Sequence, residues 1–430
     1  MAQPAATLPL RLYGALGRVL SGPALARTDK KLTAAGISDE RLAERRGWAT
    51  QARPHGSLIW VHAASVGESL SALPLISRFI EDHAVLVTSG TGTSARIMAD
   101  RLPEGAIHQF APIDTAPAVR AFFDHWRPDL GVFVESELWP RLILDAEARN
   151  IPLALVNARM SDRSLVSWSR VPATARRVLS AFRLIVTQNA ETCDGLRPFV
   201  SGTTKLCTGT NLKTATPAPS ANASALADWQ GLLVDRPAWT ASSTHPGEDG
   251  PILEAHQRLL QSVPNALCIL IPRHPERGPG IAELAASHGL RAARRGAGHT
   301  LSSETQVYVA DTIGETGLWY RAAPVVFLAG SFGDAGGHNP WEPIGCGAAL
   351  LFGPKVPNAA ADYAALTDLG AARQVDGAPS LATAVADLLR SPKALRDMRD
   401  AAEGATGEAD KMADALSADL IDLIRHTNGG

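Results

Sequence analysis

Carboxylates that follow predicted strands are the residues best placed for chemistry. Glu68 stands shortly after the apolar run Leu58–His62, where the chain turns from a strand into a helix. A carboxylate at such a turn can act as a general base on a hydroxyl group. Ser65 and Glu68 also have the spacing of a capping box, so Glu68 could simply cap the helix. The local pattern leaves both roles open.

A second acidic pair follows the apolar run Leu130–Val134. Glu135 and Glu137 lie there close to Trp139. Paired carboxylates can divide acid and base roles, or stabilise a cationic transition state of the oxocarbenium type. Alternatively, one glutamate caps the next helix and the other is solvated. Their position at a strand end makes the pair a candidate for catalysis.

Cationic residues occupy comparable positions later in the chain. Lys213 ends a segment that begins at Gly209, and a lysine there could neutralise a departing phosphate or simply be solvated. Arg273 follows Pro272 at the end of an apolar run, where arginine suits bidentate phosphate recognition. The segment Asp311–Glu315 is a third junction between a predicted strand and a helix. These positions indicate an anionic ligand.

The glycine-rich segment 329–343 contains a loop and the start of a short predicted helix. The pattern predicts Asn339 as the N-cap of this helix, Pro340 at its first position and Glu342 at its third. A helix N-terminus binds anions through its free N–H groups and its dipole. Glu342 could cap the helix or hydrogen-bond a ribose. Because the loop has more glycines than a cap needs, we predict that a ligand binds there.

Strand and helix signals alternate along most of the chain, which predicts doubly wound parallel sheets of the α/β class. Two such series occur, one on each side of a segment rich in Pro, Ser, Thr and Ala. Two Rossmann-like domains facing a central cleft are therefore expected, with ligands at the carboxyl ends of the strands. The predicted strands are Leu58–His62, Ala84–Thr88, Leu130–Glu135, Leu153–Val156, Leu184–Thr187, Ala238–Ser242, Ala266–Pro272, Gln306–Val309, Val325–Ala329 and Ala349–Phe352.

The predicted domain limits follow from this pattern, since a chain of 430 residues is too long for one ordinary core. Residues 1–50 form an N-terminal helical segment, 51–213 the first Rossmann-like domain, 214–229 a linker, and 230–430 the second Rossmann-like domain with C-terminal helices. The helical tail from Ser391 could pack back on the first domain.

Composition argues against several classes of function. The net charge is −2 and aromatic residues make up 5%, whereas nucleic-acid binders usually carry a strong basic excess or stacking aromatics. The four cysteines form no CxxC pair and no HExxH spacing occurs, so we expect a reducing compartment and no metal. Neither a complete P-loop nor a GxGxxG fingerprint is found, and no cofactor is predicted.

The N-terminal segment bears on membrane attachment. No run approaches the roughly 20 apolar residues of a membrane span. The stretch Leu8–Leu25 is apolar but interrupted by Arg11 and Arg18. It could form an amphipathic helix lying on a membrane surface, or an ordinary surface helix packed on the protein.

Eight short segments contain these candidate residues and their neighbours. They are HAASVGE (62–68), ESELWP (135–140), NARMSDRS (157–164), TGTNLK (208–213), STHPGE (243–248), PRHPER (272–277), DTIGE (311–315) and GGHNPWEP (336–343). In sequence and in order they resemble the 3-deoxy-D-manno-octulosonic acid (Kdo) transferases of Gram-negative lipopolysaccharide synthesis. The resemblance covers roughly residues 55 to 360, and eight ordered motifs make it specific.

The resemblance implies a GT-B glycosyltransferase fold and transfer of Kdo from CMP-Kdo to a lipid A precursor, lipid IVA. It also implies an inverting reaction without an essential metal or cofactor. Glu68 would be the base, and Glu135 and Lys213 would stabilise the transition state. The residues that would hold CMP are Pro272, Arg273, Ile313, Gly314, Glu315, Asn339, Pro340, Trp341 and Glu342.

The same resemblance implies a peripheral place on the cytoplasmic side of the cell inner membrane, with no nucleic-acid partner. Two alternatives stay open, namely a transferase for another CMP- or UDP-activated sugar and a non-catalytic nucleotide-sugar-binding regulator of envelope synthesis. A basic rim for the phosphates of the acceptor is expected on the first domain. Its candidates are Arg159, Arg163, Arg170, Arg176, Arg177 and Arg183.

Three places depart from the family pattern. Arg141 stands where asparagine is typical, Trp341 stands where a small aliphatic residue is usual, and Gly353–Ala359 lacks the aromatic of the family. These changes bear on specificity for the acceptor and the nucleotide, and they leave the number of transferred Kdo residues open.

Overall fold

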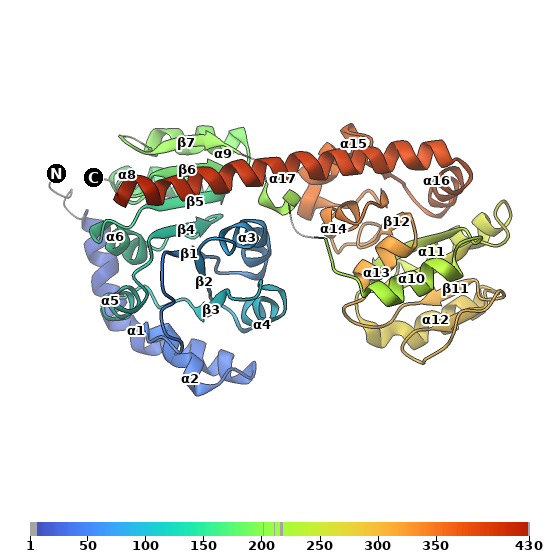
Figure 1. Cartoon of the computed structure of the whole chain (residues 1–430), viewed down its shortest axis with the longest axis horizontal. Helices are drawn as coiled ribbons and strands as arrows, with labels where there is room; N and C mark the ends of the chain where they lie inside the picture. Colours follow the sequence, from blue (N-terminus) through green and yellow to red (C-terminus); the bar gives the residue numbers. More distant parts are fainter. Residues whose placement is uncertain (1–6, 201, 210, 216–217, 429–430) are drawn as a thin grey trace. The chain divides into compact units, whose positions relative to one another are not determined.

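A computed structural model describes residues 7–200, 202–209, 211–215 and 218–428, except for the side chains at 20, 162, 213 and 426–428. The chain forms two compact units. Unit 1 comprises Met1–Ala215 and Ala409–Gly430, and unit 2 comprises Thr216–Glu408. Each unit has a parallel sheet with helices on both faces (Figure 1).

The sheet of unit 1 has seven parallel strands in the order β3-β2-β1-β4-β5-β6-β7. The order reverses at β1, which pairs with β2 on one side and β4 on the other. The loops that follow β1 and β4 therefore leave the same edge of the sheet next to each other. The strands are β1 (Leu58–His62), β2 (Ala84–Ser89), β3 (Ile107–Phe110), β4 (Leu130–Val134), β5 (Leu153–Ala158), β6 (Leu184–Thr187) and β7 (Lys205–Thr208).

Helices cover both faces of this sheet because its strand side chains alternate between two apolar clusters. Trp60 and Phe133 pack in one cluster with Phe122, and Ile59 packs in the other with Ile76. The helices are α3 (Val66–Phe79), α4 (Gly92–Arg101), α5 (Ala116–Trp126), α6 (Pro140–Ala148), α7 (Asp162–Ser169), α8 (Pro172–Leu179) and α9 (Ala190–Leu196), with 3-10 turns η1 (Ala43–Arg46), η2 (Arg197–Phe199) and η3 (Leu212–Ala215).

The sheet of unit 2 repeats this plan with seven parallel strands in the order β10-β11-β9-β8-β12-β13-β14. Here the order reverses at β8, between β9 and β12. Loops after these three strands are thus the expected place for a ligand. The strands are β8 (Ala238–Thr244), β9 (Leu267–Pro272), β10 (Ala292–Arg294), β11 (Val307–Val309), β12 (Val325–Leu328), β13 (Ala349–Phe352) and β14 (Ala372–Gln374).

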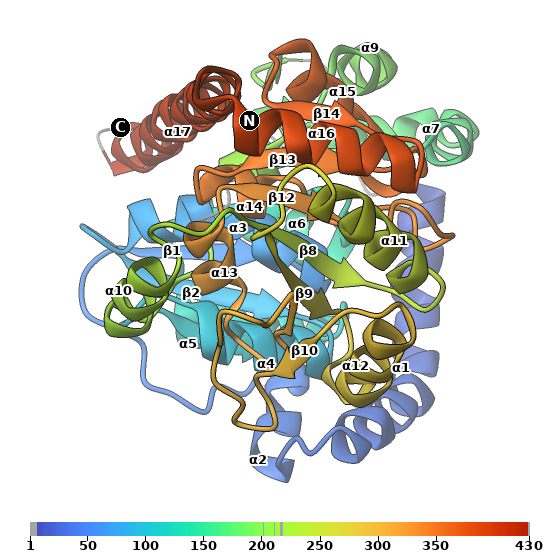
Figure 2. The same ribbon diagram turned by 90° about the vertical axis from the view of Figure 1, so that its right-hand side faces the viewer.

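Figure 2 shows α10 and α13 on one side of β8 and β9, and α11 and α12 on the other. Trp229 of α10 packs against Trp319 of α13, whereas Leu253 of α11 and Ile281 of α12 share a separate cluster. The helices are α10 (Ala223–Leu232), α11 (Asp249–Leu260), α12 (Gly278–Ser287), α13 (Thr316–Ala322), α14 (Trp341–Gly345), α15 (Ala360–Asp368) and α16 (Ala378–Arg390), with 3-10 turns η4 (Pro275–Arg277) and η5 (Pro357–Ala359).

The observed division differs from the predicted limits at two places. Helix α10 begins inside the segment predicted as a linker, because Trp229 is buried in the core of unit 2. The last helix, α17 (Pro392–Asn428), contributes Ala402 to a core cluster of unit 2 and Leu420 and Ile424 to a cluster of unit 1. The residues from Ala409 onward therefore group with unit 1.

The N-terminal stretch forms α1 (Leu8–Ala34), followed by the short α2 (Asp39–Leu42). Leu10 and Leu32 of α1 are buried, so the helix packs on unit 1 through part of its surface. No helix within the described ranges is long and apolar enough to cross a bilayer.

Candidate functional site

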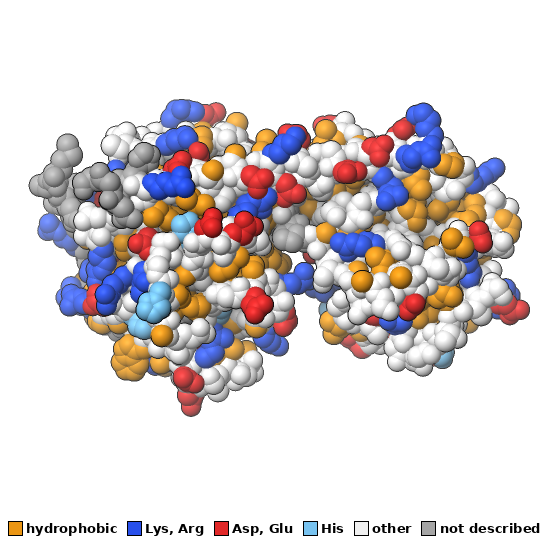
Figure 3. All heavy atoms as spheres, viewed as in Figure 1, with side chains coloured by type: hydrophobic (Ala, Val, Ile, Leu, Met, Phe, Trp, Pro, Cys, Tyr) orange, Lys and Arg blue, Asp and Glu red, His pale blue; other side chains and the backbone are white. Residues whose placement is uncertain are grey.

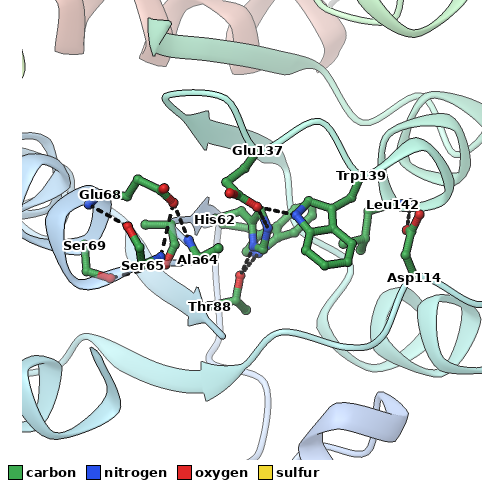
Figure 4. Close-up of polar contacts among 12 residues, drawn as sticks. His62, Ala64, Ser65, Glu68, Ser69, Thr88, Asp114, Glu137, Trp139 and Leu142 are labelled. Atoms are coloured by element: carbon green, nitrogen blue, oxygen red, sulfur yellow. Dashed lines mark hydrogen bonds and ion pairs between the residues drawn. The ribbon is translucent and has the colours of Figure 1, made fainter. Parts of the chain in front are cut away.

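Three glutamates gather at the reversal point of the sheet in unit 1. Glu68 lies on the first turn of α3, just after β1, and Glu135 and Glu137 follow the neighbouring strand β4. Figure 4 shows the carboxylates of Glu68 and Glu137 near one another, with the ring of His62 beneath that of Glu137. The fold therefore brings Glu68 close to the pair Glu135 and Glu137, although the sequence places them far apart.

Glu68 does form a capping box. Its backbone N donates to Ser65 Oγ at 3.3 Å, and its Oε2 accepts from the backbone N of Ala64 at 2.7 Å and of Ser65 at 3.2 Å. Among the described residues, Glu68 Oε1 makes no hydrogen bond, and the residue is 8% exposed. Because capping occupies only one oxygen, the other stays available to accept a proton from a ligand.

The environment makes Glu68 a stronger base than an ordinary glutamate. Burial and the nearby Glu137 carboxylate raise its pKa, and this outweighs the opposite effect of the hydrogen bonds at Ser65. Burial and the charge of Glu135 likewise raise the pKa of Glu137, although Trp139 Nε1 donates to that carboxylate. A general base works best when its pKa lies closer to the operating pH.

Glu135 is held in a left-handed backbone conformation, as is Asn157 on the adjacent strand β5, with φ values of 59° and 53°. Such conformations are costly for residues other than glycine and concentrate at functional sites. Asn157 Nδ2 lies 3.5 Å from Glu135 Oε1, and Asn157 Oδ1 accepts from the backbone N of Leu212 at 3.1 Å. Asn157 thus links Glu135 to η3.

Lys213 lies in η3, immediately after Leu212, so its backbone adjoins the same group of residues. Its side chain is outside the described part of the structure, and its role stays a prediction.

Asn157 was missed as a site residue, although it opens the segment NARMSDRS. Its position at the end of a strand beside that of Glu135 was the signal available.

His62 is fully buried beneath the glutamates and was also missed. Its Nδ1 lies 2.9 Å from Thr88 Oγ1, and its Nε2 lies 4.0 Å from Glu137 Oε2 (Figure 4). Burial lowers the pKa of His62 to about 4, so the ring is neutral at pH 7. The neutral His62 ring supports the site from below and does not neutralise the negative charge of the glutamates.

In unit 2 a buried glutamate organises the glycine-rich loop. Glu248, which is 1% exposed, accepts hydrogen bonds from the backbone N of Gly330 at 2.7 Å, Ser331 at 3.0 Å and Phe332 at 2.9 Å. It also accepts from the backbone N of His245 at 3.0 Å. The loop is therefore already bound to an internal carboxylate. Local spacing could not reveal the bonds to Gly330, Ser331 and Phe332, because these residues are distant from Glu248 in the sequence.

His338, which belongs to this loop, lies close to His245 and Arg273. His245 and His338 stack with ring centroids 5.1 Å apart, and their Nε2 atoms are 3.0 Å apart. Burial, His245 and Arg273 together lower the pKa of His338 to about 4. A β-carbon at Gly330 would lie 2.7 Å from His338 Cδ2, so the loop requires glycine there. Arg273 is exposed, whereas Pro272 is buried at the end of β9.

The segment 313–315 lies at the start of α13. Ile313 is 87% exposed, and Gly314 has a φ of 83°. Glu315 receives two hydrogen bonds from Arg295, at 3.2 and 2.6 Å. Although burial raises it, these bonds and one from Thr312 lower the pKa of Glu315 overall, so this carboxylate is ionised at pH 7.

The predicted start of α14 is wrong by one residue. Pro340 is the N-cap and Trp341 begins the helix, while Asn339 Oδ1 accepts from Trp341 N at 3.2 Å. Trp341 is 5% exposed and packs in the core with Tyr363, and Glu342 lies half-buried in the first turn. The tryptophan thus fills the core behind the loop.

The predicted basic rim is only partly exposed. Arg177 is buried and donates to Glu147 at 3.1 Å, so it acts as an internal ion-pair partner. Arg159, Arg163 and Arg170 are exposed. Throughout the described ranges, no group of three or more His, Cys, Asp or Glu side chains could hold a metal ion.

The family match and the curated relatives of this chain agree on one family. Residues 40–216 match the family described as 3-Deoxy-D-manno-octulosonic-acid transferase (kdotransferase). A probable mitochondrial 3-deoxy-D-manno-octulosonic acid transferase of Arabidopsis thaliana is 37% identical over 73% of this chain and 72% of its own length. The 3-deoxy-D-manno-octulosonic acid transferase of Haemophilus influenzae is 33% identical over 82% of this chain and 84% of its own.

A solved glycosyltransferase from Rickettsia africae has the same fold. It superposes with a TM-score of 0.54 at 10% identity and covers 88% of this chain and 100% of its own. With the two parallel seven-stranded sheets, this likeness confirms the predicted GT-B fold class.

Proposed function

The chain belongs to the 3-deoxy-D-manno-octulosonic acid (Kdo) transferase family, and we propose that it transfers Kdo from CMP-Kdo to a lipid A precursor, lipid IVA. The observation that carries this proposal is the carboxylate group at the ends of β1 and β4. There Glu68 has one oxygen without a hydrogen bond among the described residues, and its pKa is raised. A site of this kind suits the deprotonation of a sugar hydroxyl.

The proposed reaction is a single displacement with inversion. Glu68 Oε1 takes the proton of the acceptor hydroxyl, whose oxygen then bonds to the anomeric carbon of Kdo. The bond from that carbon to the phosphate oxygen breaks, and CMP leaves with its electron pair. Glu135 offsets the positive charge that develops on the sugar, and Lys213 offsets the negative charge on the phosphate.

Unit 2 is the proposed nucleotide site. Arg273 supplies an exposed guanidinium beside the histidine pair, where a phosphate would be favoured. We propose that Pro272 and Arg273 hold CMP together with residues 313–315 and 339–342. For Trp341 and Pro272, which are buried, this contact would come through the backbone.

Incubation with CMP-Kdo and a tetraacylated lipid A precursor tests this proposal. We expect mass spectrometry to detect the precursor with added Kdo, and the same yield in the presence of EDTA because no metal takes part. CMP should inhibit the reaction, whereas UDP at the same concentration should not. Inhibition by UDP alone would identify a transferase for another sugar, and binding of CMP-Kdo without any transfer would identify a regulator.

We also propose peripheral contact with the cytoplasmic face of the inner membrane through α1. Four residues spaced about one turn apart form an exposed apolar stripe on this helix. Their exposed fractions are 70% for Leu8, 55% for Leu12, 57% for Leu16 and 74% for Val19. A stripe of this size gains free energy by entering the interface of a bilayer.

Replacing Leu12 and Leu16 together by glutamate should lower binding to anionic vesicles by about tenfold, measured by flotation. The matched control replaces Leu232 and Val234 of unit 2, which are at least as exposed as Leu12 and nearly as exposed as Leu16 or more so, at 55% and 78%, by glutamate. The control should bind vesicles like the unchanged protein. Equal losses in both variants would show that added negative charge, and not the stripe, weakens binding.

A further inference from the structure

A cavity of about 600 Å³ lies in unit 1 beside the apolar stripe of α1. One wall is α1 and the other is the beginning of α6, with the turn before α5 between them. The lining combines apolar and charged groups. It includes Leu10, Gly14, Arg18, Asp114, Arg141 and Leu144.

Asp114 fixes the two walls against each other. Its side chain accepts from Tyr13 Oη on α1 at 2.8 Å, and from the backbone N of Arg141 at 2.9 Å and of Leu142 at 2.7 Å on α6. These three bonds satisfy the carboxylate inside the wall, where it is 9% exposed. The lining also contains Arg11 and Asp145, so the three arginines Arg11, Arg18 and Arg141 exceed the two carboxylates by one positive charge.

Two arginines present unused donors to the cavity. Arg141 Nε lies 3.0 Å from Asp145 Oδ1, and the side chain is 41% exposed. Arg18 makes one long bond, from Nε to Gly14 O at 3.4 Å. Within the described residues, the terminal nitrogens of both guanidinium groups make no hydrogen bond. Such groups bind phosphate with two parallel bonds.

The cavity also borders the stripe that we propose to face the membrane. Leu10, Gly14 and Arg18 follow one another at every fourth position of α1 and line the cavity, while Leu12 and Leu16 lie on the neighbouring face of the helix. With the stripe at the membrane surface, Arg18 would stand at the level of lipid headgroups. Figure 3 shows basic and apolar side chains close together over unit 1.

The cavity is connected to the carboxylates through the start of α6. Trp139 immediately precedes this helix, and its Nε1 donates to Glu137. Figure 4 shows Asp114 on the far side of Trp139 from Glu137. A phosphorylated sugar with acyl chains, lying across Trp139, would place its hydroxyl at the carboxylates and its phosphate at the arginines.

We propose that this cavity binds a phosphate group of the lipid acceptor through Arg141 and Arg18. The inference rests on the proposed function and names the recognition element of its acceptor. Leu10 and Leu144 provide apolar surface for the adjoining acyl chain. The membrane-bound acceptor, and not free phosphate, is the occupant because the cavity lies beside the stripe.

The test compares lipid IVA with its dephosphorylated form, in detergent micelles, for the unchanged protein and Arg141→Gln. We expect Arg141→Gln to raise KM for lipid IVA at least tenfold, and to leave KM for the dephosphorylated lipid and for CMP-Kdo unchanged. The control is Arg149→Gln, which removes an ion-paired arginine just beyond the other end of α6. Equal changes for both lipids, or none, would overturn the proposal.

A second variant fills the cavity without changing its charge. A β-carbon at Gly14 would meet nothing within 4 Å, so Gly14→Leu is tolerated and favours the helix. We expect a similar rise in KM for lipid IVA, whereas Gly22→Leu on the same helix, also unobstructed, should cause none. Binding of both lipids should also be measured directly, without CMP-Kdo. This measurement tests the cavity even if no transfer occurs, because absence of transfer would refute only the proposed function. Competition by millimolar inorganic phosphate equal to that by lipid would show a free-anion site instead.

Discussion

Replacing Glu68 with glutamine should lower the rate of Kdo transfer by about 10³-fold and leave the fold intact. The amide oxygen can still accept the hydrogen bonds that Ala64 N and Ser65 N donate to Oε2. The amide cannot accept a proton at neutral pH, however, so only the base function is removed. The rate should be measured with saturating CMP-Kdo and acceptor, and the fold by circular dichroism and urea unfolding.

Ser65→Ala is the matched control because it removes the other half of the capping box. It eliminates the acceptor of the bond from Glu68 N and should reduce the free energy of unfolding by about 1 kcal/mol. The carboxylate remains, so the transfer rate should change by no more than a few-fold. A large loss of rate in Ser65→Ala together with near-normal turnover in Glu68→Gln would assign Glu68 to capping alone.

The dependence of rate on pH provides a further signature of the same residue. The base must be ionised, and burial together with Glu137 raises the pKa of Glu68 above that of an ordinary glutamate. The rate of the unchanged protein should therefore fall as the pH is lowered through this raised value. The residual rate of Glu68→Gln should lack this acidic limb.

The interior strands of both sheets could be predicted from the sequence, and the edge strands could not. All ten predicted strands are present, whereas β3, β7, β10 and β14 were missed and stand at the four sheet edges. An interior parallel strand is buried on both faces and reads as a continuous apolar run. An edge strand such as β7 is largely exposed, and its polar residues hide it.

In the site, too, features that depend on residues close in sequence could be predicted, and features that depend on distant residues could not. The capping box of Ser65 and Glu68 was visible because it depends on residues three apart. The burial of His62 and the bond from Asn157 to Leu212 depend on which strands are neighbours, which a single sequence does not state. Local patterns thus identified the carboxylates and the cap of Glu68, but not the residues that neighbouring strands bring next to them.

The N-terminal helix α1 has features of both alternatives that the sequence allowed. The sequence left open a membrane-surface helix or a helix packed on the protein. Leu10 is buried and Tyr13 bonds to Asp114, while Leu8 and Leu16 are exposed on another face. The helix is packed on unit 1 and still presents an apolar face, so its attachment to the protein does not argue against contact with a membrane.

The second large effect is expected from Glu248→Gln in unit 2. The carboxylate accepts from the backbone N of Gly330 through Oε2 and from Ser331 and Phe332 through Oε1. An amide can accept at one oxygen only, and its NH₂ group would face a backbone donor. Breaking a buried charged interaction of this kind should cost about 3 kcal/mol in the free energy of unfolding.

The same change should raise KM for CMP-Kdo at least tenfold, because the loop carries His338 and leads into residues 339–342 of the proposed nucleotide site. Glu254→Gln on α11, the helix that Glu248 caps, is the control, because its carboxylate is exposed and pairs with Arg258. Its effect on unfolding should stay near 0.5 kcal/mol or less, with KM unchanged. Urea unfolding and steady-state kinetics on both variants decide the matter. If Glu248→Gln is destabilised but has a normal KM for CMP-Kdo, the loop stabilises the fold and does not bind the nucleotide. The nucleotide would then be bound by Arg273 and residues 313–315.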